Sequence, residues 1–101
     1  MIAEKPNYYA IIPANVRYDS ELRANEKLLF GEITALTDKY GECWANNKYF
    51  SELYNVKPNA IATWIRHLKE KGLISIEYEY NGKEITKRII NKNFSNTDFY
   101  T

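Results

Sequence analysis

The sequence predicts a single α+β domain that is mainly α, with three helices, a small antiparallel sheet and a carboxyl-terminal hairpin. Three observations predict it. Apolar residues recur with helical spacing over residues 24–39, the three residues Asn55-Val56-Lys57 separate two further helical segments, and Asn81-Gly82 joins two strand-like runs. At 101 residues, with 45% hydrophobic and 27% charged residues, the chain has the size and balance of one globular domain.

The amino-terminal segment is predicted to form a strand followed by a loop. Residues 8–12, YYAII, are a short apolar run that ends at Pro13, which is typical of a strand. Residues 13–21 show no clear hydrophobic period, which indicates a loop.

Residues 24–39 carry the clearest helical pattern. One apolar stripe recurs every three or four residues, formed by Leu28, Leu29, Ile33, Leu36 and, one turn earlier, Ala24 or Asn25. Tyr40 and Gly41 end the helix, because a glycine just past the last periodic residue is a common helix end. Gly31 inside the helix costs about 1 kcal/mol relative to alanine, and we interpret it as a close approach of a second helix.

A short extended piece leads into the second helix. Residues 42–45 are predicted to be extended. Asn46 is suited to cap a helix over residues 47–54, because its side chain can accept a hydrogen bond from a free backbone amide. The apolar stripe of this helix consists of Phe50, Leu53 and Tyr54.

The third helix follows after a tight turn. Asn55 tolerates the left-handed conformation that such a turn often needs. Pro58 is suited to begin the helix, because the amide that proline lacks would be unpaired in the first turn. The helix is predicted to run to Lys71 and to be closed by Gly72. Its buried stripe consists of Ile61, Ile65 and Leu68, with Trp64 beside it.

Residues 73–80 and 84–90 are predicted to pair as a hairpin. In the first run Ile74, Ile76, Tyr78 and Tyr80 alternate with Ser75, Glu77 and Glu79, and in the second Ile85, Lys87 and Ile89 share one face. Asn81-Gly82 predicts a type I′ turn, which needs positive φ at both central positions. We expect one domain over residues 1–92, and a tail or the start of a linker to a further carboxyl-terminal domain over residues 93–101.

This order of elements is the layout of a winged helix-turn-helix domain. In that fold the helix after the tight turn enters the major groove of double-stranded DNA, and the hairpin, called the wing, lies against the backbone or the minor groove. Residues 56–101 hold eight Lys/Arg against five Asp/Glu, whereas residues 1–55 hold six against eight. The basic excess therefore lies in the half of the chain that contains both elements.

The outward face of the third helix supplies the candidate base contacts. With Ile61 taken as the inward direction, Asn59, Thr63, Arg66 and Glu70 lie within about 40° of directly outward. Glu70 would repel phosphate, so the predicted DNA face does not extend through the far end of the helix. Asparagine can bond adenine bidentately, arginine can bond guanine, and threonine can offer its hydroxyl and methyl groups. The candidate base-contacting residues are Lys57, Asn59, Thr63 and Arg66. Taken one at a time, each is explained equally well as a solvated polar position.

Cations on the second helix and on the wing are the candidate backbone contacts. Lysine and arginine there would bind phosphates and give affinity without sequence reading. The candidates are Lys48, Lys83, Lys87 and Arg88. Cross-strand ion pairs with Glu77, Glu79 and Glu84 explain the cations of the wing as well as phosphate contacts do. For Lys48, a solvated side chain is at least as good an explanation as a phosphate contact.

The composition gives little support for a disulfide, a metal site, an enzyme or a membrane protein. The single cysteine, Cys43, and the single histidine, His67, exclude an internal disulfide, zinc sites with two or more cysteines and His-pair metal sites. We expect no cofactor, no metal and no enzyme activity, since no nucleophile–base arrangement and no phosphate-cradling loop is found. No apolar run approaches the roughly 20 residues that span a bilayer, and no signal peptide is recognised, so a cytoplasmic protein is expected.

Four further residues are interpreted structurally. Cys43 is expected to be a small buried hydrophobe. Tyr78 and Tyr80 are expected to pack around Trp44 rather than to stack on nucleic acid. His67 is interpreted as a partly exposed helix residue rather than a ligand or a base.

Several stretches resemble one protein family. They are KLLFGEITAL in the first helix, CWANNKYFSELYNV through the second, and WIRHLKEKGLI at the end of the third, preceded by YYAIIPANVRYDSEL. Over about Tyr8 to Lys92 the chain resembles the amino-terminal winged helix-turn-helix domain of replication initiators, or replisome organisers, from phages and plasmids of Gram-positive bacteria. The resemblance implies origin DNA binding, with a second domain that forms a homo-oligomer or engages host helicase-loading proteins.

The chain departs from the family pattern at three places. Lys57 replaces the usual serine or threonine before the recognition helix, Arg23-Ala24 replaces the usual Ser-Pro before the first helix, and Ala60-Ile61 lacks a common hydroxyl contact. From the layout of the elements and the resemblance together, we expect sequence-specific binding of double-stranded DNA by an initiator. The alternatives are a transcriptional regulator of the same fold and a winged helix used for protein–protein assembly.

Overall fold

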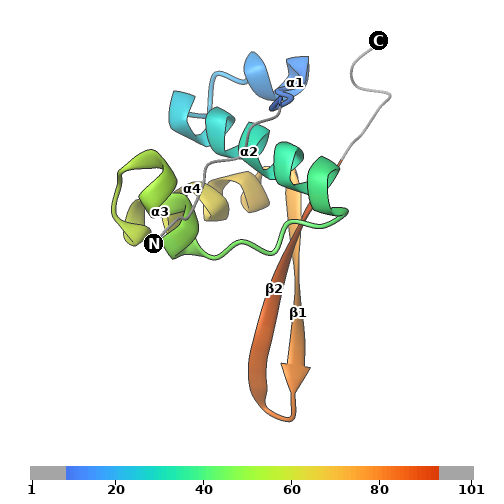
Figure 1. Cartoon of the computed structure of the whole chain (residues 1–101). Helices are drawn as coiled ribbons and strands as arrows, with labels where there is room; N and C mark the ends of the chain where they lie inside the picture. The colour runs from blue at the N-terminus through green and yellow to red at the C-terminus, as the bar shows by residue number, and fades with distance from the viewer. Residues whose placement is uncertain (1–8, 94–101) are drawn as a thin grey trace.

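The computed structural model describes residues 9–93, and it forms a mainly α winged helix. Four helices precede a two-stranded antiparallel sheet that projects from the helical body (Figure 1). The elements are α1 (Ala14–Arg17), α2 (Ala24–Tyr40), α3 (Asn47–Tyr54), α4 (Pro58–Glu70), β1 (Ile74–Asn81) and β2 (Glu84–Lys92). The fold class predicted from the sequence is confirmed. The expected tail over residues 93–101 lies outside the described residues from residue 94 onward.

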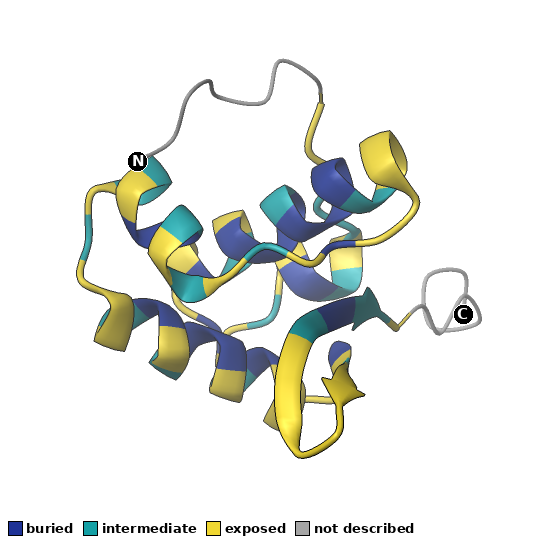
Figure 2. Cartoon of the chain, turned by 60° about the horizontal axis from the view of Figure 1, so that its bottom comes forward, coloured by how far each residue is buried: buried dark blue, intermediate teal, exposed yellow. Residues whose placement is uncertain are grey.

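One hydrophobic core joins the helices to the base of the wing. It combines residues of α2, α3 and α4 with the inner ends of both strands, and Figure 2 shows the buried side of each helix turned inward. Its largest fully buried apolar members are Phe30, Phe50, Leu29, Ile33, Ile61, Leu68, Ile74 and Ile90. The wing is thus anchored at its base, while residues farther along the hairpin are exposed.

The first long helix is one residue longer than predicted, and its buried stripe is shifted. Gly41 follows it with a left-handed φ of 82°, as expected for a glycine at a helix end. Leu28 was placed on the buried stripe, and this was wrong, because its side chain is 48% exposed. Leu28 lies about 100° around the helix from the fully buried Leu29. Phe30 takes its place on the buried face, beside the correctly predicted Leu29, Ile33 and Leu36.

Gly31 does mark a close approach, but no helix makes it. A Cβ at Gly31 would lie 3.0 Å from Ile12 Cγ1 and 3.1 Å from Ala10 Cβ, so the extended amino-terminal segment is what packs there. The strand predicted over this segment was wrong for the described residues 9–12. Ile11 bonds through its backbone to a helix side chain, with its N–H donating to Thr34 Oγ1 at 2.9 Å.

The predicted loop over residues 13–21 contains the short helix α1. Two backbone amides, of Val16 and Arg17, donate to the carbonyl of Pro13 at 3.0 and 2.8 Å. Val16 is fully buried. One apolar residue cannot produce a hydrophobic period, which is why pattern analysis missed this single turn.

The helix-turn-helix itself follows the prediction closely. Asn46 caps α3 by accepting from the amide of Tyr49 at 2.8 Å, and Asn55 ends it with φ 55° and ψ 50°. Pro58 occupies the first turn of α4. The helix ends at Glu70, one residue before the predicted Lys71, and Gly72 then takes a φ of 74°.

The wing differs from the prediction at its turn. The loop consists of Gly82 and Lys83, and Asn81 pairs with Glu84. Gly82 has φ 65°, while Asn81 does not have positive φ, so the predicted type I′ turn was wrong. A positive φ at the first central residue alone is the pattern of a type II′ turn, which places glycine first.

A bulge explains the shift in the turn. Glu79 pairs with Lys87 but Tyr80 pairs with Ile85, so Thr86 is the extra residue of the second strand. Thr86 Oγ1 donates to the carbonyl of Glu79 at 3.2 Å. The bulge moves Ile85 onto the face of Tyr80, so the expected common face for Ile85, Lys87 and Ile89 was wrong.

The extended piece before α3 pairs with the wing through one backbone bridge. Cys43 forms an isolated antiparallel bridge with Ile90, whose amide donates to the carbonyl of Cys43 at 2.7 Å. This contact fixes β2 beside the segment that leads into α3.

Candidate nucleic-acid interface

Helix α4 separates an apolar face from a polar one. Ile61, Ile65 and Leu68 are buried, whereas Asn59 and Arg66 on the opposite face are exposed. Asn55 ends α3 in the left-handed conformation, and Pro58 begins α4 after the intervening Val56 and Lys57. The sequence therefore placed the outward face of the recognition helix correctly.

The polar groups of this face are held only weakly within the domain. Thr63 is half-buried, and its hydroxyl donates to the carbonyl of Asn59 at 3.1 Å. Arg66 lies 3.8 Å from Glu70, with both side chains about 60% exposed. An exposed pair of this kind contributes under about 1 kcal/mol. The guanidinium of Arg66 can therefore leave Glu70 at little cost. Lys57 is exposed at the amino-terminal end of the helix.

The sequence that forms these helices matches a known domain family. The model of a helix-turn-helix domain family matches residues 20–74, which is more than half of the 101 residues. The chain belongs to this helix-turn-helix family. The matched residues run from the loop before α2 to the first residue of β1. No curated protein and no solved structure matches the chain.

The cations of the wing of this helix-turn-helix protein are divided between the interior and the surface. Lys83 is exposed in the loop at the wing tip, and Lys48 is exposed in the first turn of α3. Lys87 instead lies 3.1 Å from Glu42 and 5.7 Å from the centre of the Trp44 ring. The ion pairing considered as the alternative for Lys87 is present, but its partner comes from outside the hairpin.

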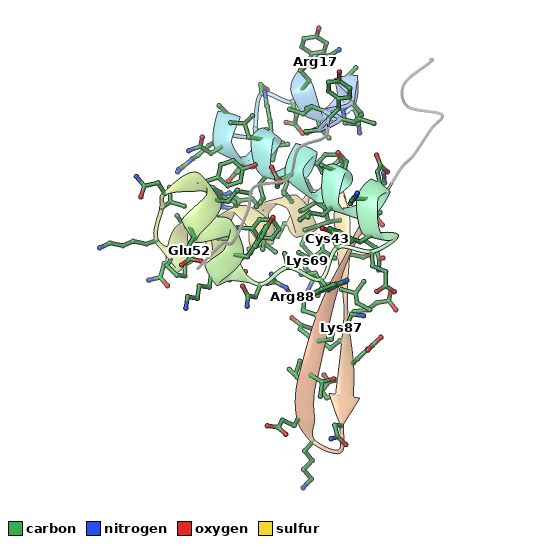
Figure 3. All side chains as sticks on the ribbon, in the orientation of Figure 1. Arg17, Cys43, Glu52, Lys69, Lys87 and Arg88 are labelled. Atoms are coloured by element: carbon green, nitrogen blue, oxygen red, sulfur yellow. The ribbon has the colours of Figure 1, made fainter. Side chains whose placement is uncertain are left out.

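Arg88 ties the wing to the helices. It is half-buried, with Nη1 donating to Asn47 Oδ1 and Nη2 donating to the carbonyl of Ala45, both at 2.8 Å (Figure 3). Burial lowers the pKa of Arg88, because it disfavours the charged form. The structure thus shows an internal contact for this side chain, and we leave Arg88 out of the proposed interface.

The outer half of the wing carries an apolar face. Tyr78, Tyr80 and Ile85 are each about half exposed, and the two tyrosine rings lie 6.5 Å apart. They were expected to pack around Trp44, and this was wrong. Trp44 is itself 54% exposed, and its ring contacts Lys87. Lys87 lies opposite Glu79 in the strand register, so its side chain is on the hairpin face away from Tyr78 and Tyr80.

Two polar links that the sequence reading missed hold α4 against the start of α2. Glu26 is fully buried, and its carboxylate contacts Nδ1 of His67. Lys71, just past α4, lies 2.9 Å from Asp19 and 2.5 Å from Glu21. A glutamate three residues after a helix N-cap was the available signal, but arginine at the N-cap position concealed it.

The remaining sequence expectations concern burial and membranes. Cys43 is fully buried, as expected, and burial raises the pKa of its thiol to about 11. Among the described residues, no helix is both long and apolar enough to cross a bilayer. Within residues 9–93, no three side chains of the kinds that bind metals come together.

Proposed function

We propose that this domain binds double-stranded DNA sequence-specifically, with the exposed face of α4 in the major groove. A helix-turn-helix domain indicates a DNA partner. The observation that supports this assignment most strongly is the outward face of α4, where Asn59, Thr63 and Arg66 are accessible on a helix whose opposite face is fixed in the core. A rigid helix presents its side chains with little entropic cost on binding.

Each side chain of this face has a specific capacity. Asn59 can bond the N6 and N7 edge of adenine, and Arg66 can bond O6 and N7 of guanine. Thr63 can offer its methyl group to thymine or its hydroxyl to a base or phosphate. Lys57, at the amino-terminal end of α4, supports an anion there together with the helix dipole.

Backbone contacts are assigned to the exposed cations that flank this helix. Lys48 lies in the first turn of α3, the helix that crosses the DNA backbone in this fold, and Lys83 lies at the wing tip. Such contacts add affinity that depends on salt but not on sequence.

As the wider role, we favour origin recognition by a phage or plasmid replication initiator. This rests on the resemblance of the KLLFGEITAL and WIRHLKEKGLI stretches to that family. In this role the domain binds and does not catalyse. A second domain would supply oligomerisation or contact with helicase-loading proteins. A transcriptional regulator would use the same groove contacts, and the genomic position of the selected sites distinguishes the two.

The test is a fluorescence anisotropy titration against a random-sequence duplex at low salt, followed by selection from random duplexes. We expect non-specific binding at roughly 1–100 μM. Arg66→Ala should weaken binding to the selected site and relax base preference at one position. Lys39→Ala, which removes an exposed cation at the far end of α2, is the matched control. Equal losses on selected and random duplexes for Arg66→Ala would refute its base contact.

Protein–protein assembly is the second candidate, and the wing favours it. Its outer half exposes Tyr78, Tyr80 and Ile85, while Lys87 and Arg88 contact other parts of the domain. Absence of binding to any duplex below about 100 μM would favour this candidate over the first.

A further inference from the structure

We propose that His67 is a proton-linked phosphate contact, positioned by the buried carboxylate of Glu26. The inference rests on the proposed DNA binding and adds to it a residue and a pH dependence. It follows from the contact between a fully buried acid on α2 and a half-buried imidazole on the recognition helix.

The carboxylate of Glu26 determines how the imidazole is oriented. Its Oε1 accepts from the backbone amide of Arg23 at 3.0 Å, and its Oε2 contacts Nδ1 of His67. An ionised carboxylate only accepts hydrogen bonds, so Nδ1 carries a proton in this pair. A fully buried carboxylate also needs hydrogen-bond partners, and the Nδ1–H group of His67 supplies one in the neutral or the charged ring.

The other edge of the ring is available to a ligand. The side chain of His67 is 32% exposed, and because Nδ1 contacts the buried Glu26, Nε2 is the ring nitrogen left for a ligand. His67 comes one turn after Thr63 and next to Arg66, and it lies about 60° from the outward direction of α4. It therefore borders the face proposed to enter the groove, where phosphates are the nearest anions.

The charged groups around the Glu26–His67 pair have partners within the domain. Lys71, at the end of α4, is bonded to Asp19 and Glu21 of the loop before α2. Arg66 is paired with Glu70 on α4 itself. A phosphate at Nε2 would place the ring of His67 between two anions, which favours the imidazolium form.

Binding and proton uptake are then linked. If the complex holds the proton more tightly than the free protein, affinity rises as pH falls, by up to about tenfold per pH unit for one proton. His67 is the only histidine in the chain, so a proton taken up near neutral pH by a side chain is readily assigned.

The experiment measures affinity for a random-sequence duplex between about pH 5 and 8 at fixed ionic strength. The variants are His67→Gln, which retains a donor for Glu26 but cannot be charged, and Lys69→Gln, which removes an exposed charge from the same helix. We expect affinity to rise at low pH in the wild type and in Lys69→Gln but not in His67→Gln. Equal slopes in wild type and His67→Gln would overturn the inference.

A second measurement avoids any substitution. The imidazole protons of His67 give one NMR titration, recorded with and without the duplex. We expect DNA to move its midpoint to higher pH, and an unchanged midpoint would overturn the role of His67. DNA binding without this pH response refutes only the present inference, whereas absence of binding at every pH refutes the proposed function as well.

Discussion

Replacing Arg88 with methionine is expected to destabilise the domain, by an amount set by its two hydrogen bonds. The guanidinium donates to Asn47 Oδ1 and to the carbonyl of Ala45, each at 2.8 Å. A hydrogen bond with one charged partner contributes about 1.5–3 kcal/mol. Methionine keeps much of the apolar stem, so the change reports mainly on the guanidinium.

Two features of the site reduce the combined contribution of the two hydrogen bonds to the free energy of unfolding. Burial lowers the pKa of Arg88, so desolvation of the charge opposes the gain from the hydrogen bonds, and Nε is buried with no partner among the described residues. The side chain is also only half-buried, so water replaces part of what is lost. We therefore expect Arg88→Met to lower the free energy of unfolding by about 1.5–3 kcal/mol in total.

Urea denaturation followed by far-ultraviolet circular dichroism measures this loss. With a slope of about 1–2 kcal/mol per molar urea, the midpoint should fall by roughly 1–3 M. Lys83→Met, at the exposed wing tip, is the matched control and should leave the midpoint unchanged. If Arg88→Met kept its midpoint but bound DNA more weakly, Arg88 would be a backbone contact and its internal role would be refuted.

The remaining predictions concern a cap, a charge cluster and the wing tip. Asn46→Ala should cost about 1 kcal/mol in the same assay, because it removes the acceptor for the amide of Tyr49, and an unchanged midpoint would contradict the cap. The hydrogen bond from Lys71 lowers the pKa of Asp19 below its ordinary value of 3.8. The ionised carboxylate therefore stabilises the fold fully above pH 3.8, and this stabilisation is lost as the pH falls through the lowered pKa of the folded protein. Asp19→Asn should therefore have a shallower loss of stability in acid than the wild type, and identical acid profiles would argue against the pair. Lys83→Ala should reduce the salt dependence of DNA binding by about one unit of slope without altering base preference, and an unchanged slope would remove the wing tip from the interface.

The helix-turn-helix could be predicted from the sequence because its signals are local. Asn46, Asn55 and Pro58 each specify one backbone conformation through their own chemistry, and all three are found as expected. The buried stripe of α4 follows equally directly from helical periodicity. Local chemistry and tertiary packing agree in this segment, which is why both helices begin where they were predicted.

The errors occur where distant residues determine the outcome. Gly31 is required by Ile12 and Ala10, which approach from a segment that was mistaken for a strand. The bulge at Thr86 shifts the register by one residue, and no residue-type signal distinguished it from a regular hairpin. One shift of this kind exchanges the faces of the strand beyond it.

The candidate site shows the same division. The accessible polar residues of α4 follow from periodicity alone, whereas the contacts of Lys87 with Glu42 and of Glu26 with His67 link residues more than 40 positions apart. Whether a cation is free or internally paired depends on such distant partners. Sequence therefore supplied a list of cations, and tertiary structure was needed to choose among them.

The division among the cations also bears on affinity. Lys48, Lys57, Lys83 and Arg66 remain exposed at the proposed interface, while Lys87 and Arg88 are held within the domain. Even if all four bound phosphate, the salt slope would be only about 3–4, well below that of large dimeric DNA-binding proteins. We therefore expect that pairing of two domains would raise the affinity of the proposed binding, since two linked half-sites multiply their contributions. The small number of free cations is thus a physical reason to expect more than one copy of this domain on each functional DNA site.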